Sequence, residues 1–365
     1  MSPTPNFVTG LELSESFYRE AARPILDAHF PDLPHSAALI GWGSEVLGYD
    51  DAQSTDHSWG ARFYLFLAEA DRERYAKPVH RALAENLPRE FRGYPTSFDQ
   101  PDEAGVRLAR QTDSETVEHA IGCETVRSFF GWYLGCDPHA EIKTVDWLTF
   151  SEHKLLGATS GRVFHDGLRE LEPARRKFSY YPDDVWAFLL ARQWGKLSEN
   201  EAFVGRCGAT GDELGSAVLA ARQVGILMGL CFLMERSYAP YGKWFGRAFS
   251  RLHAAAEMTP ALEAALSATT WKEREAHLSA AYETAARMHN ALGITPPLRE
   301  KVSDYYGRGY LVIHADEFMA AIRETISSPD IFKLKHHVGS VNQFVDSTDL
   351  LSKVELCRTL KALYE

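Results

Sequence analysis

The hydrophobic positions in the first half of the chain alternate between short strand-like runs and helical spacing. Apolar runs predict strands over residues 37–42, 61–68 and 143–150, and an extended segment over 161–166. Residues 88–115 are rich in Pro, Gly, Asp and Arg, which favours an irregular excursion. This half is therefore predicted to combine a sheet with helices. The expected helices span residues 10–29, 77–86, 116–135 and 152–158.

The pattern changes near residue 170, after which every periodic segment fits a helix and no strand pair is expected. We therefore predict an α+β protein with two domains. Residues 1–168 would form an α/β domain and residues 169–365 a helical domain. The expected helices of the second domain span residues 183–197, 211–236, 243–256, 260–267, 271–293, 297–305, 314–327 and 347–364.

Composition and charge narrow the choice of function. The chain has 365 residues, of which 45% are hydrophobic and 24% charged, as in an ordinary globular protein. Its formal net charge of −11 argues against bulk binding to a nucleic-acid backbone. Local basic pockets for a nucleotide remain compatible with that balance, because they need only a few lysines or arginines.

The cysteines and the apolar segments indicate a cytoplasmic protein. The five cysteines are scattered and form no Cys-x-x-Cys pair, which disfavours a disulfide framework or a zinc knuckle. No signal peptide is visible in residues 1–10. The most apolar stretch, Ala217 to Met234, contains Arg222 and Gln223, so we expect a buried helix there and no membrane association.

One motif carries candidate chemistry. Gly43-Ser44 follows the first predicted strand, and eleven residues separate Ser44 from Asp56, which is expected to enter the second strand. Backbone amides at such a turn can hold phosphates. Carboxylates supply the oxygen ligands that Mg²⁺ prefers. The combination suits nucleotidyl transfer, in which two divalent ions clamped by acids neutralise charge around an α-phosphorus.

The motif resembles the signature of the DNA polymerase β-like nucleotidyltransferase superfamily, in which Gly-Ser is followed by paired acids. Three stretches more specifically resemble the DUF4037 family of nucleotidyltransferase-like proteins: Gly43–Gly60, Asp146–Phe150 and Tyr238–Gly246. The resemblance implies a nucleotidyltransferase-type mixed sheet and a third carboxylate near residue 146, where Val145-Asp146 fits. It also implies that the helical half closes an acceptor pocket, as in small-molecule nucleotidyltransferases.

These considerations assign roles to a small set of residues. Asp56 and Asp146 are the expected catalytic and metal-binding acids, and Asp51 is a further candidate metal ligand. The expected ion is Mg²⁺ or Mn²⁺, and a nucleoside triphosphate is the expected co-substrate. The residues expected to contact the nucleotide are Gly43, Ser44, Lys243 and Arg222. For Arg222 the default interpretation is a buried ion pair, because an arginine in an apolar helix needs a partner, and the phosphate contact is the more specific option.

Ser58 departs from the pattern, since an acid is expected two positions after Asp56. A serine hydroxyl is a neutral, weak ligand, so the ion cage loses one negative charge. Three outcomes stay open: replacement by Asp50, Asp51 or Glu45, weak catalysis with one ion, or binding without transfer. The sequence therefore predicts a metal-dependent nucleotidyltransferase acting on a small-molecule acceptor, with a catalytically degenerate nucleotide- or partner-binding protein as the alternative. It assigns neither the acceptor nor the oligomeric state.

Overall fold

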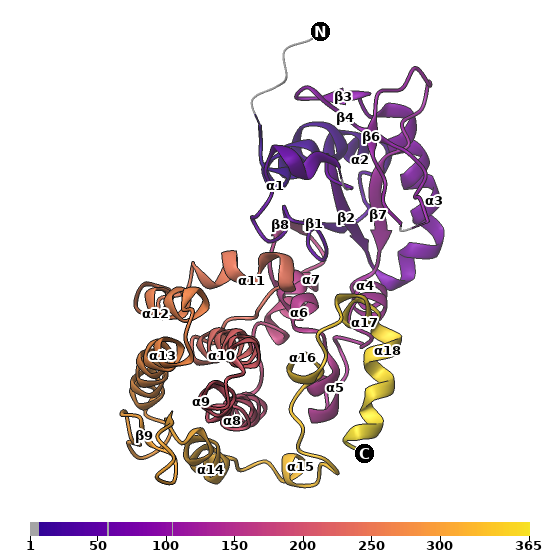
Figure 1. Cartoon of the computed structure of the whole chain (residues 1–365). Helices are drawn as coiled ribbons and strands as arrows, with labels where there is room; N and C mark the ends of the chain where they lie inside the picture. The colour runs from indigo at the N-terminus through magenta and orange to yellow at the C-terminus, as the bar shows by residue number, and fades with distance from the viewer. Residues whose placement is uncertain (1–6, 57, 104) are drawn as a thin grey trace. The chain divides into compact units, whose positions relative to one another are not determined.

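The computed structural model describes residues 7–56, 58–103 and 105–365. The chain forms two compact units, and each is described by itself. The sheet unit contains the residues up to Ile142 together with Lys154–Ser179, and the helical unit contains Lys143–His153 together with Tyr180–Glu365. Figure 1 shows the elements of both units in chain colours. The domain boundary expected after residue 168 remains a prediction.

A mixed four-stranded sheet forms the centre of the sheet unit, with the strand order β7-β2-β1-β8. β1 pairs antiparallel with both β2 and β8, whereas β2 and β7 run parallel (Figure 1). All five residues of β1 are buried, as expected for a central strand. The strands span His35–Leu39 (β1), Arg62–Leu67 (β2), Ala120–Glu124 (β7) and Arg162–Asp166 (β8).

The main core packs on one face of this sheet. Phe63 and Leu65 of β2 project into it, because alternate residues of a strand share a face. Phe17 and Tyr18 cover them from the N-terminal helical segment, with Phe63 against Tyr18 at 5.5 Å between ring centroids. The helices of this unit are α1 (Gly10–Phe17), α2 (Arg23–His29), α3 (Glu69–Asn86), α4 (Val126–Tyr133), α6 (Glu152–Thr159, which crosses the boundary between units) and α7 (Leu171–Lys177), and a π-helical turn spans Tyr18–Ala22.

Three of the predicted strands are confirmed, but the strand predicted over residues 143–150 is wrong. This segment is a helix, α5 (Thr144–Thr149), because the Asp146 carboxylate accepts a hydrogen bond from the Lys143 N–H at 2.9 Å and so caps the first turn. The fourth strand is β7, inside the helix predicted over 116–135. Gly122 faces the Tyr64 ring there, where a Cβ would come within 2.8 Å of it.

The segment over residues 88–115, predicted to be irregular, contains two short antiparallel strand pairs. β3 (Glu90–Phe91) pairs with β4 (Tyr94–Pro95), and β5 (Ser97–Phe98) pairs with β6 (Ala109–Arg110).

The helical unit is built around α10, which packs against α8, α9, α12 and α13. α8 also packs against α14, where the Trp194 and Phe318 rings stack with centroids 4.2 Å apart. Side-chain caps begin two of the long helices: Asp212 accepts from Gly215 N–H, and Thr270 accepts from Glu273 N–H. The long helices span Asp183–Ser198 (α8), Phe203–Ala209 (α9), Glu213–Met234 (α10), Gly242–Phe249 (α11), Ala255–Ser267 (α12), Trp271–Leu292 (α13) and Ala315–Thr325 (α14).

Two predictions for the helical unit need correction. The helix predicted over 297–305 is absent, because Pro296 and Pro297 open the segment and its end pairs in a two-stranded hairpin, β9 (Ser303–Asp304) with β10 (Leu311–Val312). The single helix predicted over 347–364 is divided into α17 (Thr348–Ser352), α18 (Val354–Thr359) and a 3₁₀ turn (Leu360–Leu363). Two further short helices, α15 (Pro329–Phe332) and α16 (Val341–Phe344), precede it.

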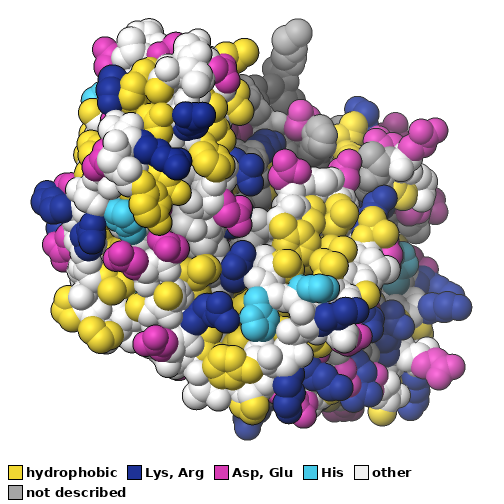
Figure 2. Space-filling view, turned by 60° about the horizontal axis from the view of Figure 1, so that its bottom comes forward, with side chains coloured by type: hydrophobic (Ala, Val, Ile, Leu, Met, Phe, Trp, Pro, Cys, Tyr) yellow, Lys and Arg dark blue, Asp and Glu magenta, His cyan; other side chains and the backbone are white. Residues whose placement is uncertain are grey.

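α10 is the one helix among the described residues that is long and apolar enough to cross a membrane. In the structure 56% of its most apolar window is buried within the protein, as expected of a core helix. On the face drawn in Figure 2, lysine and arginine side chains lie interspersed with acidic and hydrophobic ones.

Two glycines with similar backbone angles provide a test of the sheet geometry. Gly161 (φ +71°) precedes β8, and a Cβ there would overlap the Leu39 carbonyl of β1, whereas Gly48 (φ +67°) has open space around it. We expect Gly48→Ala to cost about 1 kcal/mol, from backbone strain alone. Gly161→Ala should cost roughly 2 kcal/mol more, because the strands must separate. Urea denaturation of both variants measures this; equal costs would contradict the close strand contact.

Candidate functional site

The Gly-Ser segment lies where the chain leaves β1. Gly41 and Gly43 have positive φ angles of 94° and 124°, which residues with a side chain rarely adopt. Residues 44–48 then form a turn, in which the Tyr49 N–H donates to the Ser44 carbonyl at 2.9 Å. The Gly-Ser pair therefore opens a tight turn, not a helix.

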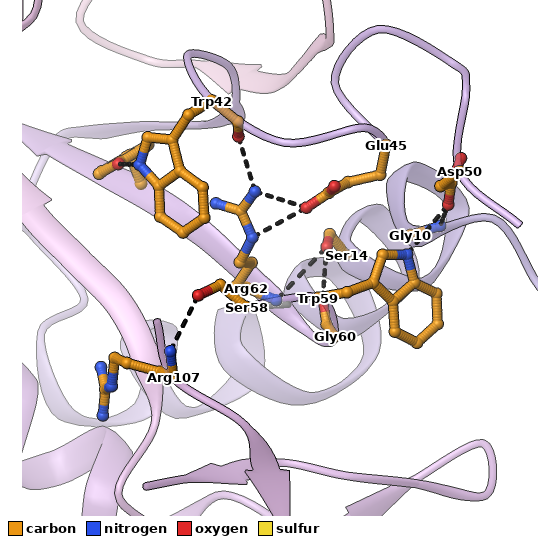
Figure 3. Close-up of polar contacts among 11 residues, drawn as sticks. Gly10, Ser14, Trp42, Glu45, Asp50, Ser58, Trp59, Gly60, Arg62 and Arg107 are labelled. Carbon is orange, nitrogen blue, oxygen red and sulfur yellow. Dashed lines mark hydrogen bonds and ion pairs between the residues drawn. The ribbon is translucent and has the colours of Figure 1, made fainter. Parts of the chain in front are cut away.

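A buried ion pair holds this turn against the sheet. Arg62, the first residue of β2, donates to Glu45 Oε1 from Nε at 2.9 Å and from Nη2 at 2.5 Å. Nη2 also donates to the Trp42 carbonyl at 2.7 Å, and the guanidinium lies 3.9 Å from the Trp42 ring centroid (Figure 3). The Arg62 and Glu45 side chains are only 4% and 2% exposed. One desolvated cation thus binds both the backbone and the side chains of the turn.

Gly43 fits against this ion pair so closely that a side chain has no room. A Cβ at residue 43 would overlap both the Arg62 guanidinium and the Glu45 carboxylate. Among the residues that the structure describes, none accepts a hydrogen bond from the backbone N–H of Gly43 or Ser44. Adjacent N–H groups in a fixed turn are the donors that an anion such as a phosphate uses.

The acids after the turn are largely engaged in local structure. Asp50 accepts from the Gly10 N–H at 2.7 Å and from Trp59 Nε1 at 3.0 Å, so it ties the loop to α1 (Figure 3). Asp51 accepts from the Gln53 N–H at 2.9 Å and thereby caps a 3₁₀ turn (Ala52–Asp56). Of the three acids considered as replacements at the ion cage, Asp50 and Asp51 bind backbone N–H groups and Glu45 binds Arg62.

Asp56 ends the 3₁₀ turn and is exposed. The prediction that it enters the second strand is wrong, because β2 begins only at Arg62. The backbone at Gly60 explains why the strand begins later than predicted. Gly60 has a φ of +148°, and a Cβ there would come within 2.9 Å of the Phe98 ring. The extended conformation that pairs with β1 therefore begins only after this contact.

Ser58, which stands where an acid is expected, has a structural role. It is buried, with a φ of +49°. Its Oγ accepts from the Arg107 N–H at 3.0 Å (Figure 3). Its N–H donates to the Arg107 carbonyl, also at 3.0 Å. These two hydrogen bonds hold the loop at Ser58 against the segment 88–115, which lies between β2 and β7 in the sequence.

The acids do not fit a three-ligand ion cage. In residues 7–56, 58–103 and 105–365, no group of three or more His, Cys, Asp or Glu side chains could hold a metal ion. The described residues therefore define no ion-dependent reaction step. Asp56 and Asp51 remain proposed metal ligands, and His57 lies outside the described residues.

The structure places Asp146 in the helical unit. It lies in the first turn of α5, where its carboxylate accepts from the Lys143 N–H and forms an ion pair with Lys361. Asp56 belongs to the sheet unit, so the pairing of these two acids stays a prediction.

The two predicted cations also lie in the helical unit. Lys243 is an exposed residue in the first turn of α11, with its ammonium 4.9 Å from the Trp244 ring centroid. Arg222 is exposed on α10 and lines a cavity of about 890 Å³ within the helical unit. The buried ion pair considered for Arg222 is therefore wrong, because this part of the apolar helix faces a cavity. Phosphate contacts for either residue stay predictions.

Two features of the structure have no counterpart among the predictions from sequence. Arg62 was not singled out, although a charged residue beginning a buried apolar strand signals a required partner. Glu152 was also missed: its carboxyl group lines the helical-unit cavity, and burial raises its pKa to about 7, although the Ala239 N–H donates to it. No local motif marks Glu152, because its surroundings come from residues distant in sequence.

One of three comparisons with known proteins, that with family models, agrees with the family resemblance. Residues 147–245 match the model of a family described as Domain of unknown function (DUF4037), which confirms the resemblance over that segment. Among solved structures, the chain is similar to a nucleotidyltransferase-like protein from Exiguobacterium sibiricum 255-15, with 11% identity and a TM-score of 0.30 over 78% of this chain and 77% of that one. The search of curated proteins found no match.

The buried ion pair gives a stability prediction. Arg62→Met or Glu45→Met should each cost about 3–5 kcal/mol of unfolding free energy, because each leaves a buried charge without its partner. The double variant should be less destabilised than either single variant, since both charges are removed. A double-mutant cycle measured by chemical denaturation tests this; simple addition of the two costs would show that the charges do not depend on each other.

The raised pKa of Glu152 gives a pH prediction. The folded state keeps this carboxyl protonated up to about pH 7, whereas the unfolded chain releases the proton near the ordinary value of 4.5. The folded state then binds more protons, so this group lowers stability as pH rises from 4.5 to 7. Relative to the wild type, Glu152→Gln should gain up to about 3 kcal/mol across that range. Urea denaturation at several pH values measures the difference; a pH-independent difference would refute the assignment.

Proposed function

We propose that the chain is a nucleotidyltransferase-like protein that binds a nucleoside triphosphate at the Gly43-Ser44 turn and transfers a nucleotidyl group to a small-molecule acceptor. The observation that carries the proposal is the fixed turn itself. Its two N–H groups have no acceptor within the described parts of the chain, and a buried ion pair holds them in place. Donors that are already ordered bind an anion without the entropic cost of ordering the turn.

The pair also sets the local electrostatics. Glu45 neutralises Arg62, so the turn offers oriented amide dipoles and little net charge. Such a site can take the phosphate end of a ligand, and the exposed indole of Trp42 beside it offers a stacking surface for a base. The proposed Mg²⁺ or Mn²⁺ would arrive with the triphosphate, with Asp56 and Asp51 as its proposed protein ligands.

Ser58 favours a second candidate function, in which the protein binds a nucleotide or a partner without transfer. Its hydroxyl is engaged by the Arg107 N–H, and it carries no charge for an ion. Binding and transfer can be separated because they place different demands on the site. The turn suffices for phosphate binding, whereas transfer requires charge neutralisation at the reacting phosphorus.

Calorimetric titration with nucleoside triphosphates, with and without Mg²⁺, tests the binding proposal. The wild type should bind, and Gly43→Ala should lose at least about tenfold in affinity, because its Cβ displaces the ion pair behind the donors. Gly48→Ala is the matched control: it lies in the same turn at positive φ with open space, and it should bind like the wild type. Equal affinity for all three proteins would exclude the turn as the phosphate site.

A pyrophosphate-release assay then separates transfer from binding alone. Transfer predicts Mg²⁺-dependent release that Asp56→Ala reduces at least about 100-fold. Binding without transfer predicts no release by the wild type. In that case Ser58→Asp is informative, because aspartate tolerates the positive φ and can still accept from the Arg107 N–H. A gain of activity in this variant would show that residue 58 limits the natural protein.

A further inference from the structure

The cavity of the helical unit lies along two facing helices. α8 and α10 run antiparallel, as cross-helix hydrogen bonds show: Gln193 Nε2 donates to the Ile226 carbonyl at 2.9 Å, and Gln223 Nε2 donates to the Leu197 carbonyl at 3.0 Å. The lining residues repeat every three or four positions, so each helix presents one face to the cavity. The lining residues of α10 are Arg222, Gly225, Ile226, Gly229, Phe232 and Leu233.

One end of this cavity carries an excess of positive charge. Arg192 and Lys196 lie one turn apart on α8, and Arg222 lies opposite them on α10. Burial lowers the pKa of Lys196, and the charges of Arg222 and Arg192 lower it further, while Glu199 raises it. The cations are therefore close enough to repel one another. The other carboxyl groups lining the cavity belong to Asp346 and Glu152.

The protein supplies these cations with few counter-charges. The Lys196 ammonium donates to the neutral carbonyl of Gln343. Arg192 Nη2 lies 3.9 Å from the carboxylate of Glu199, which is 55% exposed, and its buried Nε has no hydrogen-bond partner among the described atoms. Arg222 makes no hydrogen bond or ion pair with any residue that the structure describes. Of the three cations, only Arg192 has a carboxylate within ion-pair distance, and that carboxylate is largely exposed, so an anionic ligand would stabilise the arrangement.

The rest of the cavity suits the body of an organic molecule. Gly225, one turn from Arg222, faces open space, since a Cβ there would meet no atom within 4 Å. Beyond it, Ile226, Phe232 and Phe245 form an apolar wall. A volume of about 890 Å³ is sufficient for a small metabolite. The cavity thus combines a cationic end with an apolar body.

We propose that this cavity binds a small organic phosphomonoester, whose phosphate is held by Lys196 and Arg222 with Arg192, and whose organic part lies over Gly225 against the apolar wall. A doubly charged phosphate matches three cations better than a single carboxylate does. The site lies wholly within the helical unit and requires no nucleotide at the Gly43-Ser44 turn, so the inference goes beyond the proposed function.

The test uses phenyl phosphate, inorganic phosphate and benzoate as probes, with binding to the full chain followed by calorimetry at constant ionic strength. Phenyl phosphate should bind at least about tenfold more tightly than either other probe, because only it has both the dianion and the apolar ring. Comparable binding of all three probes, or no saturable binding of phenyl phosphate, would overturn the proposal.

Substitutions of residues that line the cavity test whether phenyl phosphate binds there. Arg222→Met and Lys196→Met should each weaken phenyl phosphate binding at least about tenfold. Gly225→Leu should abolish binding by filling the cavity, and it should fold because leucine favours a helix more than glycine does. Lys335→Met removes an exposed cation that does not line the cavity, and it should bind like the wild type.

Gly43→Ala distinguishes this proposal from the function proposed for the turn. It should lose nucleotide affinity and keep phenyl phosphate affinity. If phenyl phosphate binding falls in Gly43→Ala or Lys335→Met as much as in Arg222→Met, the probe does not report on this cavity and the proposal fails.

Discussion

The sheet unit depends on one buried ion pair. Arg62 begins the strand next to β1, and Glu45 lies in the turn that follows β1, so their contact fixes the turn relative to two strands at once. The Trp42 carbonyl and ring complete the surroundings of the guanidinium. Since charges are costly to bury without a partner, neither side chain can move away independently. The glycines at positive φ and the ordered N–H donors of the turn follow from that constraint.

Much of the fold could be predicted from sequence because it follows local periodicity. β1, β2 and β8 appear as apolar runs, and α10 and α13 as long helical patterns. The failures occurred where a side-chain cap or a tertiary contact overrides that pattern. Asp146 caps a helix in a segment that looks like a strand, and Gly122 allows a strand against Tyr64 within an apparent helix.

The candidate site was predictable only in part. Gly43 and Ser44 are recognisable by their spacing, and the structure gives both a physical reason for their place in the turn. The partner of Arg62 could not be found in the sequence, because Glu45 lies 17 positions before it and a turn intervenes. Ser58 departs from the expected motif, and its bonds to Arg107 depend on a loop whose path no periodicity reveals.

The most direct test of the central claim is a crystal structure of the chain with Mn²⁺ and a non-hydrolysable nucleoside triphosphate analogue, with the anomalous signal used to locate manganese. The account predicts phosphate oxygens within hydrogen-bond distance of the Gly43 and Ser44 N–H groups, with the Arg62–Glu45 pair intact behind them. An analogue bound elsewhere, with that turn empty, would contradict it.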